Sequence, residues 1–262
     1  MTENASGTDK LRAVLVLVAT IGTIAFNWLA AAGYVGGVTP EVISNNYPTP
    51  ITPAGYAFAI WSLIYLGMIA FSFYQLVPAN IARFRDIRSL YIMSCALNCA
   101  WIFFWHGNQI AVCLAVIAAL LFTLLLINIK LRDNKSTGDT WAAKVPFGIY
   151  FGWVTAATLV NFAVLLNYLN IQMSPTAATT TGVILILFAA AMGVLVRIKL
   201  SNCVYPLAIA WALTAIAVKQ SGQTLIVVAA AVGVIACLIA CLSFVINLPS
   251  SETRTSGRTQ AN

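Results

Sequence analysis

The segment from Gln109 to Ile129, QIAVCLAVIAALLFTLLLINI, is a run of 21 residues without a charged side chain. The basic segment KLRDNK, residues 130–135, follows it directly. About 20 apolar residues are needed for a helix to cross the hydrocarbon core of a bilayer. Because backbone groups in lipid must form their hydrogen bonds within the segment, this run predicts a membrane-spanning helix.

The same pattern recurs along the whole chain. Seven further apolar runs are Leu11–Ala32, Ala54–Val77, Ile87–Trp105, Val145–Tyr168, Ala177–Val196, Cys203–Val218 and Thr224–Ile246. Of the 262 residues 61% are hydrophobic and only 8% are charged, against roughly a quarter charged in soluble domains. These values argue against a soluble globule, a disordered chain and a nucleic-acid binder. We predict an all-α fold, a polytopic membrane helix bundle of about eight transmembrane helices, of which Cys203–Val218 is the shortest.

The basic residues are distributed unequally between the two ends of these helices. Thirteen of the 14 Lys and Arg residues lie in the two tails and in the second, fourth and sixth connections, and only Lys219 lies on the opposite side. This is the positive-inside pattern. It predicts a multi-pass protein of the cell membrane with both termini in the cytoplasm, and it explains the net charge of +7 without nucleic acid. A cleaved signal peptide ending near Ala32 is the alternative for the first run, but the run is long for one.

Few side chains are suited to catalysis or to metal binding. The six cysteines lie in apolar runs without Cys-x-x-Cys spacing, which predicts packing residues and neither a zinc site nor disulfides. No Asp or Glu lies within a predicted span, which argues against a proton-driven pump. The single histidine, His106, predicts an interfacial hydrogen bond, with axial haem ligation as the minor alternative. No nucleophile–base set is present, so we do not expect an enzyme.

Polar and aromatic side chains recur at helical spacing in four of the predicted spans. These series are Thr20, Thr23, Asn27 and Tyr34; Trp61, Tyr65, Met68, Ser72 and Gln75; Tyr91, Ser94, Asn98, Trp101 and Trp105; and Trp153, Ala157 and Asn161. Amide side chains are unfavourable against lipid, so each series should face the bundle interior and together line a neutral, aromatic cavity. Alternatively, Trp105 and Tyr34 belong to an interfacial aromatic belt, and Asn98 and Asn161 only join helices.

Two further features concern helix packing and the connection after the first span. Small residues recur every four positions at Gly148, Gly152 and Ala156 and at Ala111, Ala115 and Ala119, which favours close helix packing within the chain or between the chains of a homodimer.

The connection Gly33–Pro53 is the longest in the chain and is rich in glycine and proline. We interpret it as a lid over the cavity, with a plain surface connection as the alternative.

Three motifs resemble the TspO/translocator-protein family, whose members are also called tryptophan-rich sensory proteins. The stretch TPAGYAFAIWSLIY, residues 52–65, looks like the start of that family's second helix. The stretch ALNCAW, residues 96–101, with Gly107 resembles its third-helix motif, and Trp153, Ala157 and Asn161 match its fifth-helix motif. The resemblance covers about residues 11–168 and implies a compact five-helix bundle. Family members bind porphyrins, sterols and synthetic aromatic ligands in a pocket under the first loop.

The resemblance implies which residues would form the pocket. With the residues chosen above, the expected ligand-binding set is Asn27, Tyr56, Trp61, Tyr65, Asn98, Trp101, Trp153, Ala157 and Asn161. Tyr56 lies near the position of a family tryptophan, although the local spacing is one residue shorter. The segment after the fifth span lacks the Lys or Arg of the sterol-recognition pattern, so a sterol is not the expected ligand.

These observations together give the expected organisation and function. We predict a cytoplasmic tail over residues 1–10, a five-helix bundle over 11–168, three additional helices over 169–247 and a polar tail over 248–262. The expected function is binding of a planar, largely apolar ligand such as a porphyrin or haem, in a sensory or ligand-handling role. The partners expected are the lipid bilayer and this small aromatic ligand. The alternative is a carrier or permease for a small neutral solute.

Overall fold

A computed structural model describes residues 6–134 and 136–243; residues 1–5 and the predicted polar tail over 248–262 lie outside this part of the chain. The described residues form helices and no strands. The helices are α1 (Gly7–Ala31), α2 (Pro40–Asn46), α3 (Ile60–Tyr74), α4 (Pro78–Ile81), α5 (Arg85–His106), α6 (Ile110–Leu131), α7 (Thr137–Asp139), α8 (Val145–Tyr168), α9 (Pro175–Leu200), α10 (Tyr205–Lys219) and α11 (Thr224–Leu242). A 3₁₀ turn, η1 (Gly55–Ala59), precedes α3, and a π-helical turn, η2 (Thr140–Lys144), precedes α8.

The helix ends follow from local sequence signals. Ser6 caps α1 in a capping box with Asp9, and Ser174 caps α9 directly before Pro175. Such caps satisfy N–H groups that have no partner within the helix, and Pro fits the first helical turn because it lacks an N–H. The predicted spans are confirmed as helices to within a few residues over the described chain.

Seven of the described helices are long and apolar enough to cross a membrane. Of the eight predicted spans, α10 is the short one, with 15 residues and so a length of about 22 Å, less than the roughly 30 Å of a bilayer core. α3 also has 15 residues, but η1 extends it to the 20 residues Gly55–Tyr74. α10 packs against α8, α9 and α11, so much of its surface is covered by other helices. The expected all-α membrane bundle is confirmed, with one helix that is too short to span the core alone.

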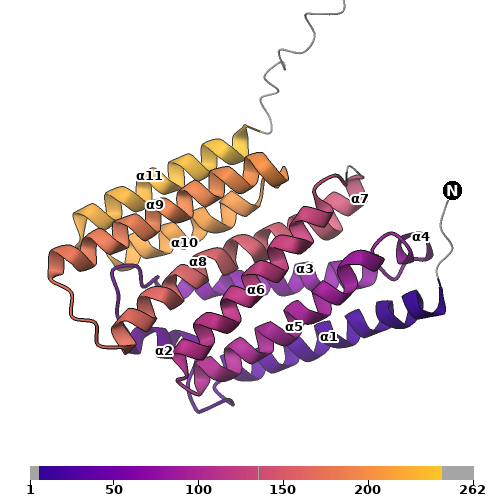
Figure 1. The fold of residues 1–262 in the computed structure, drawn as a ribbon, viewed down its shortest axis with the longest axis horizontal. Coiled ribbons are helices and arrows are strands. Elements are labelled where there is room, and N and C mark those ends of the chain that lie inside the picture. Colours follow the sequence, from indigo (N-terminus) through magenta and orange to yellow (C-terminus); the bar gives the residue numbers. More distant parts are fainter. Residues whose placement is uncertain (1–5, 135, 244–262) are drawn as a thin grey trace, which may run out of the picture.

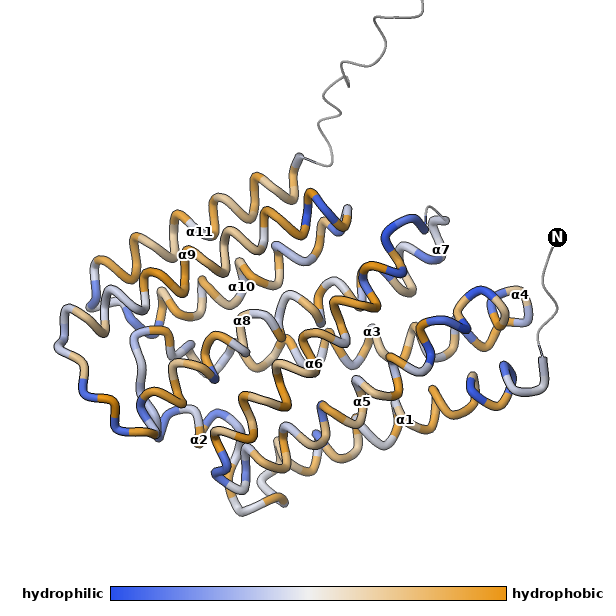
Figure 2. Tube along the Cα trace, viewed as in Figure 1, coloured by the Kyte–Doolittle hydropathy of each residue, from blue (hydrophilic) through white to orange (hydrophobic). Residues whose placement is uncertain are grey.

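The helices lie side by side, as Figure 1 shows. α1 packs on α5 and α3, α5 packs on α6, α6 packs on α8, and α10 joins α8 to α9 and α11. In Figure 2 the hydrophilic segments gather at the helix ends. We call the end that carries α2 the loop end, and the end that carries α4 and α7 the basic end.

The two small-residue series have different surroundings. A Cβ added to Gly152 would lie 2.5 Å from the carbonyl oxygen of Tyr205, so the glycine allows α8 and α10 to approach closely. The predicted packing of this series therefore occurs within the chain. Ala111, Ala115 and Ala119 on α6 are exposed, so they make no close helix contact here.

Candidate ligand-binding site

The two ends of the helix bundle are filled differently. Toward the basic end, Phe71 contacts both Tyr91 and Phe147, with ring centroids 5.2 and 4.9 Å apart. The Thr20 hydroxyl lies 2.5 Å from the Tyr91 hydroxyl and 2.6 Å from that of Ser72. These buried groups satisfy one another, so this half of the core is closed.

The loop-end half contains a cavity with a volume of about 30 Å³, roughly the space of one water molecule. Its walls come from five elements and the lid, and its surface is almost entirely apolar. The lining residues are Ser44, Pro53, Phe58, Trp61, Trp101, Trp105, Trp153, Ala156, Ala157, Val160, Asn161, Ala212 and Ile216. Five of the nine residues expected from the sequence, namely Trp61, Trp101, Trp153, Ala157 and Asn161, are therefore brought together here.

Aromatic rings form most of the cavity wall, with Trp61 at the centre. Its ring stacks with that of Trp101, at 6.3 Å between centroids and 27° between planes. It meets Trp153 edge-to-face at 6.3 Å and 84°, and Tyr65 stacks on it at 5.7 Å. Trp105 extends the stack beyond Trp101 at 5.8 Å. Such offset and edge-to-face pairs are the favoured arrangements of aromatic rings, so the wall is well ordered around a small space.

The polar atoms of this wall differ in whether they have a hydrogen-bond partner. The Trp101 indole Nε1 donates to Oδ1 of Asn161 at 3.2 Å, and the Asn161 amide donates to the Ala157 carbonyl at 2.9 Å. The Trp153 indole Nε1 is buried and has no hydrogen-bond partner. A buried donor without an acceptor costs about 1–3 kcal/mol. The wall of the cavity therefore includes a residue, Trp153, whose buried indole N–H is unpaired.

A second group of expected residues lies next to the cavity rather than on its wall. The Asn27 amide donates to Oδ1 of Asn98 at 2.7 Å, and the Asn98 amide donates to the Tyr150 hydroxyl at 3.0 Å. This chain joins α1, α5 and α8 directly beside Trp61, whose ring contacts Tyr150. Asn27, Asn98 and Tyr65 thus support the wall by fixing the helices and rings behind it.

Tyr56 and Tyr34 point away from the cavity. Tyr56 is 42% exposed, and its ring meets Trp211 of α10 edge-to-face at 5.3 Å. The structure therefore places Tyr56 outside the cavity, because the 3₁₀ turn η1 directs its side chain toward α10. Tyr34 is exposed beside Trp28, whereas Trp105 is buried and does not belong to an outward-facing belt.

The connection Gly33–Pro53 covers the cavity and is held by side chains from several helices. Trp105 donates to the Pro40 carbonyl, and His106 lies 3.2 Å from the Val38 carbonyl. Asn167 donates to the Pro48 carbonyl, and Gln220 donates to the carbonyls of Thr49 and Thr52. His106 thus makes the interfacial hydrogen bonds expected of it. Within residues 6–134 and 136–243, no group of three His, Cys, Asp or Glu side chains could hold a metal ion.

Residues on α10 complete the cavity, although nothing in the sequence marked them. Ala212 and Ile216 line it, and the Trp211 indole donates to the Ala57 carbonyl at 3.0 Å. The Tyr205 hydroxyl bonds that of Thr155 at 2.8 Å, which fixes α10 against α8. The only signal was the alanine-rich face of this short helix, and that pattern is equally typical of plain helix packing.

The family described as TSPO-like protein matches residues 13–244. The chain belongs to this family. The match runs past residue 168, where the resemblance in the motifs ended, and continues through α9, α10 and α11 of this TSPO-like protein. Comparison with curated proteins and with solved structures gives no significant match.

Proposed function

We propose that this TSPO-like membrane protein binds a planar, largely apolar ligand of the porphyrin class in the aromatic cavity. The observation that carries the proposal is Trp153, a residue on the wall of an apolar cavity whose buried indole N–H has no partner. Ligand pockets are typically apolar with a few polar groups that fix orientation. A ligand with a hydrogen-bond acceptor at its edge would supply the missing partner while its ring system packs against the indoles.

The proposed ligand is larger than the present space. A tetrapyrrole cannot enter about 30 Å³, so binding requires the rings or the lid to move apart. The small side chains of Ala156 and Ala157 on one wall, and of Ala212 on the opposite helix, provide room beside the indoles. Binding should therefore change the environment of Trp61, Trp101 and Trp153 together, which tryptophan fluorescence reports.

Binding is favoured over transport of a neutral solute, the alternative function. The half of the core toward the basic end is closed by Phe71, Tyr91 and Phe147, whose rings contact one another. A carrier would need these rings to separate during each cycle. The structure thus supports a pocket that opens toward the loop end, and a sensory or ligand-handling role.

The placement in the membrane is part of the proposal. We place the basic end in the cytoplasm and the lid outside, in the cell membrane, because the Lys and Arg residues gather at the basic end. We also propose that α10, supported by α9 and α11, forms a further wall of the site, in place of a contact with a second chain. Reporter fusions at both ends of the chain test the orientation, and sizing in detergent tests for a homodimer.

A spectral titration tests the proposed site. Purified protein in detergent is titrated with a panel of porphyrins, and Trp153→Phe is compared with the wild type. Loss of the indole N–H should weaken binding about fivefold to tenfold, the equivalent of one hydrogen bond of roughly 1 kcal/mol. Trp28→Phe is the matched control, because Trp28 is 64% exposed and does not line the cavity. Equal affinities for the wild type and Trp153→Phe would refute the role of Trp153, and absence of porphyrin binding would refute the proposed ligand.

A further inference from the structure

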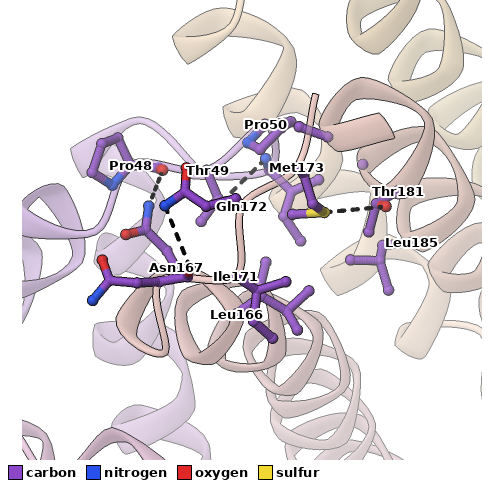
Figure 3. A pocket seen from close by; sticks show the side chains of 15 residues that line it. Pro48, Thr49, Pro50, Leu166, Asn167, Ile171, Gln172, Met173, Thr181 and Leu185 are labelled. Carbon is purple, nitrogen blue, oxygen red and sulfur yellow. Dashed lines mark hydrogen bonds between the residues drawn. The ribbon is translucent and has the colours of Figure 1, made fainter. Parts of the chain in front are cut away.

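A second hollow lies at the loop end, between α8, α9 and the lid. It has a volume of about 260 Å³ and opens to the surface of the molecule. Figure 3 shows Pro48, Asn167, Gln172 and Leu185 around it. We call it the outer cleft. Its floor is apolar, with Ala163, Leu166 and Leu185, whereas the exposed residues Asn167, Asn170 and Gln172 supply amide groups at its rim.

A small void lies between the outer cleft and the aromatic cavity. It has a volume of about 10 Å³ and lies between α8, α9 and α10. Ala156, Val160 and Ile216 line both this void and the aromatic cavity. Ile51 and Leu185 line both the void and the outer cleft. The three spaces therefore follow one another along α8, and aliphatic side chains separate them.

We infer that the outer cleft is the mouth of a route by which the ligand reaches the aromatic cavity, passing between α8 and the α9–α10 pair. This inference rests on the proposed function for the identity of the ligand. The molecule suited to this route has a flat apolar body and a polar edge, since the cleft has an apolar floor and an amide-lined rim. Leu185 and Ile51 are the side chains that separate the cleft from the void, and Leu185 is the one on α9.

A ligand could instead enter by lifting the connection Gly33–Pro53, but that route breaks more hydrogen bonds than the route beside α8. Lifting the lid would break its bonds with Trp105, Asn167 and Gln220, and each hydrogen bond contributes about 0.5–1.5 kcal/mol. Opening the void requires the aliphatic side chains on it, such as Ile51, Leu185 and Ile216, to move apart, and aliphatic side chains make no hydrogen bonds. The hydrogen bonds that hold the connection Gly33–Pro53 can therefore stay in place while the side route opens.

The kinetics of porphyrin binding test the route. In Leu185→Trp the larger side chain should slow both association and dissociation by about tenfold, and in Leu185→Ala both should become several-fold faster. The ratio of the two rate constants should stay within twofold, because Leu185 does not line the aromatic cavity. Leu187→Trp is the matched control, since Leu187 lies on the exposed face of the same helix. Unchanged rates in both Leu185 variants would overturn the inference.

A second measurement needs no porphyrin and so separates this inference from the proposed function. Ala156→Cys places a thiol between the aromatic cavity and the void, and its alkylation by N-ethylmaleimide is followed by peptide mass spectrometry, with the six native cysteines as internal references. Adding Leu185→Trp should slow alkylation of Cys at position 156 about tenfold, and adding Leu187→Trp should not. An equal rate with and without Leu185→Trp, or no alkylation at all, would overturn the route whatever the protein binds.

Discussion

Trp101 and Trp153 allow one chemical change to be compared at two places on the same cavity wall. Both side chains are 4% exposed, so replacement by Phe removes a similar buried volume at each site. The two indoles differ because Trp101 donates to Asn161, whereas Trp153 has no partner. The difference in unfolding free energy between Trp101→Phe and Trp153→Phe therefore isolates the hydrogen bond.

The structure gives the sign and the size of this difference. Trp101→Phe loses a hydrogen bond, which contributes about 0.6 kcal/mol on average within membranes, and it leaves the buried Asn161 Oδ1 unpaired. Trp153→Phe loses no bond and removes an unpaired donor, which costs the wild type about 1–3 kcal/mol. We expect Trp153→Phe to be more stable than Trp101→Phe by about 2–4 kcal/mol, the sum of these two contributions, although both lose packing area.

Reversible unfolding in mixed micelles, followed by circular dichroism as the fraction of denaturing detergent rises, measures this difference. Trp28→Phe is the control for the loss of an exposed indole and should change stability by less than about 0.5 kcal/mol. If Trp101→Phe proved as stable as Trp153→Phe, or more stable, the assignment of paired and unpaired indoles would be wrong.

Three further predictions concern helix packing, the cavity and the lid. Gly152→Ala should destabilise the protein by about 1–3 kcal/mol because its Cβ would meet the Tyr205 carbonyl. Gly22→Ala is the control and should be neutral or stabilising, because no atom lies near that position. Thermal unfolding compares the two variants, and equal effects would contradict the close contact. Ala157→Phe should fill the cavity and weaken porphyrin binding at least tenfold with the helix content unchanged, so full affinity in a folded variant would exclude the site. Gln220→Ala should speed hydrogen exchange at residues 49–52 severalfold by removing two bonds to the lid, and unchanged protection there would show that Gln220 does not hold it.

The sequence alone was sufficient for the secondary structure and for much of the cavity wall. Long uncharged runs such as Gln109–Ile129 predict spanning helices because lipid allows few other structures, and this prediction is independent of tertiary contacts. The four-residue spacing of Trp153, Ala157 and Asn161 put them on one face of α8, where the structure has them on the cavity wall. Periodicity succeeds here because it concerns one helix at a time.

Only the tertiary structure could show which side chains of different helices lie together. Periodicity put Asn98 and Trp101 on the interior side of α5, but only packing placed Trp101 on the cavity and Asn98 behind it, between Asn27 and Tyr150. Tyr56 turned outward because a 3₁₀ turn changed its direction, and α10 entered the site although Ala212 and Ile216 carry no polar signal. Aliphatic side chains look alike in a sequence whether they face lipid, a neighbouring helix or a cavity. The part of the wall that α10 forms and the route beside it therefore depend on how the helices pack.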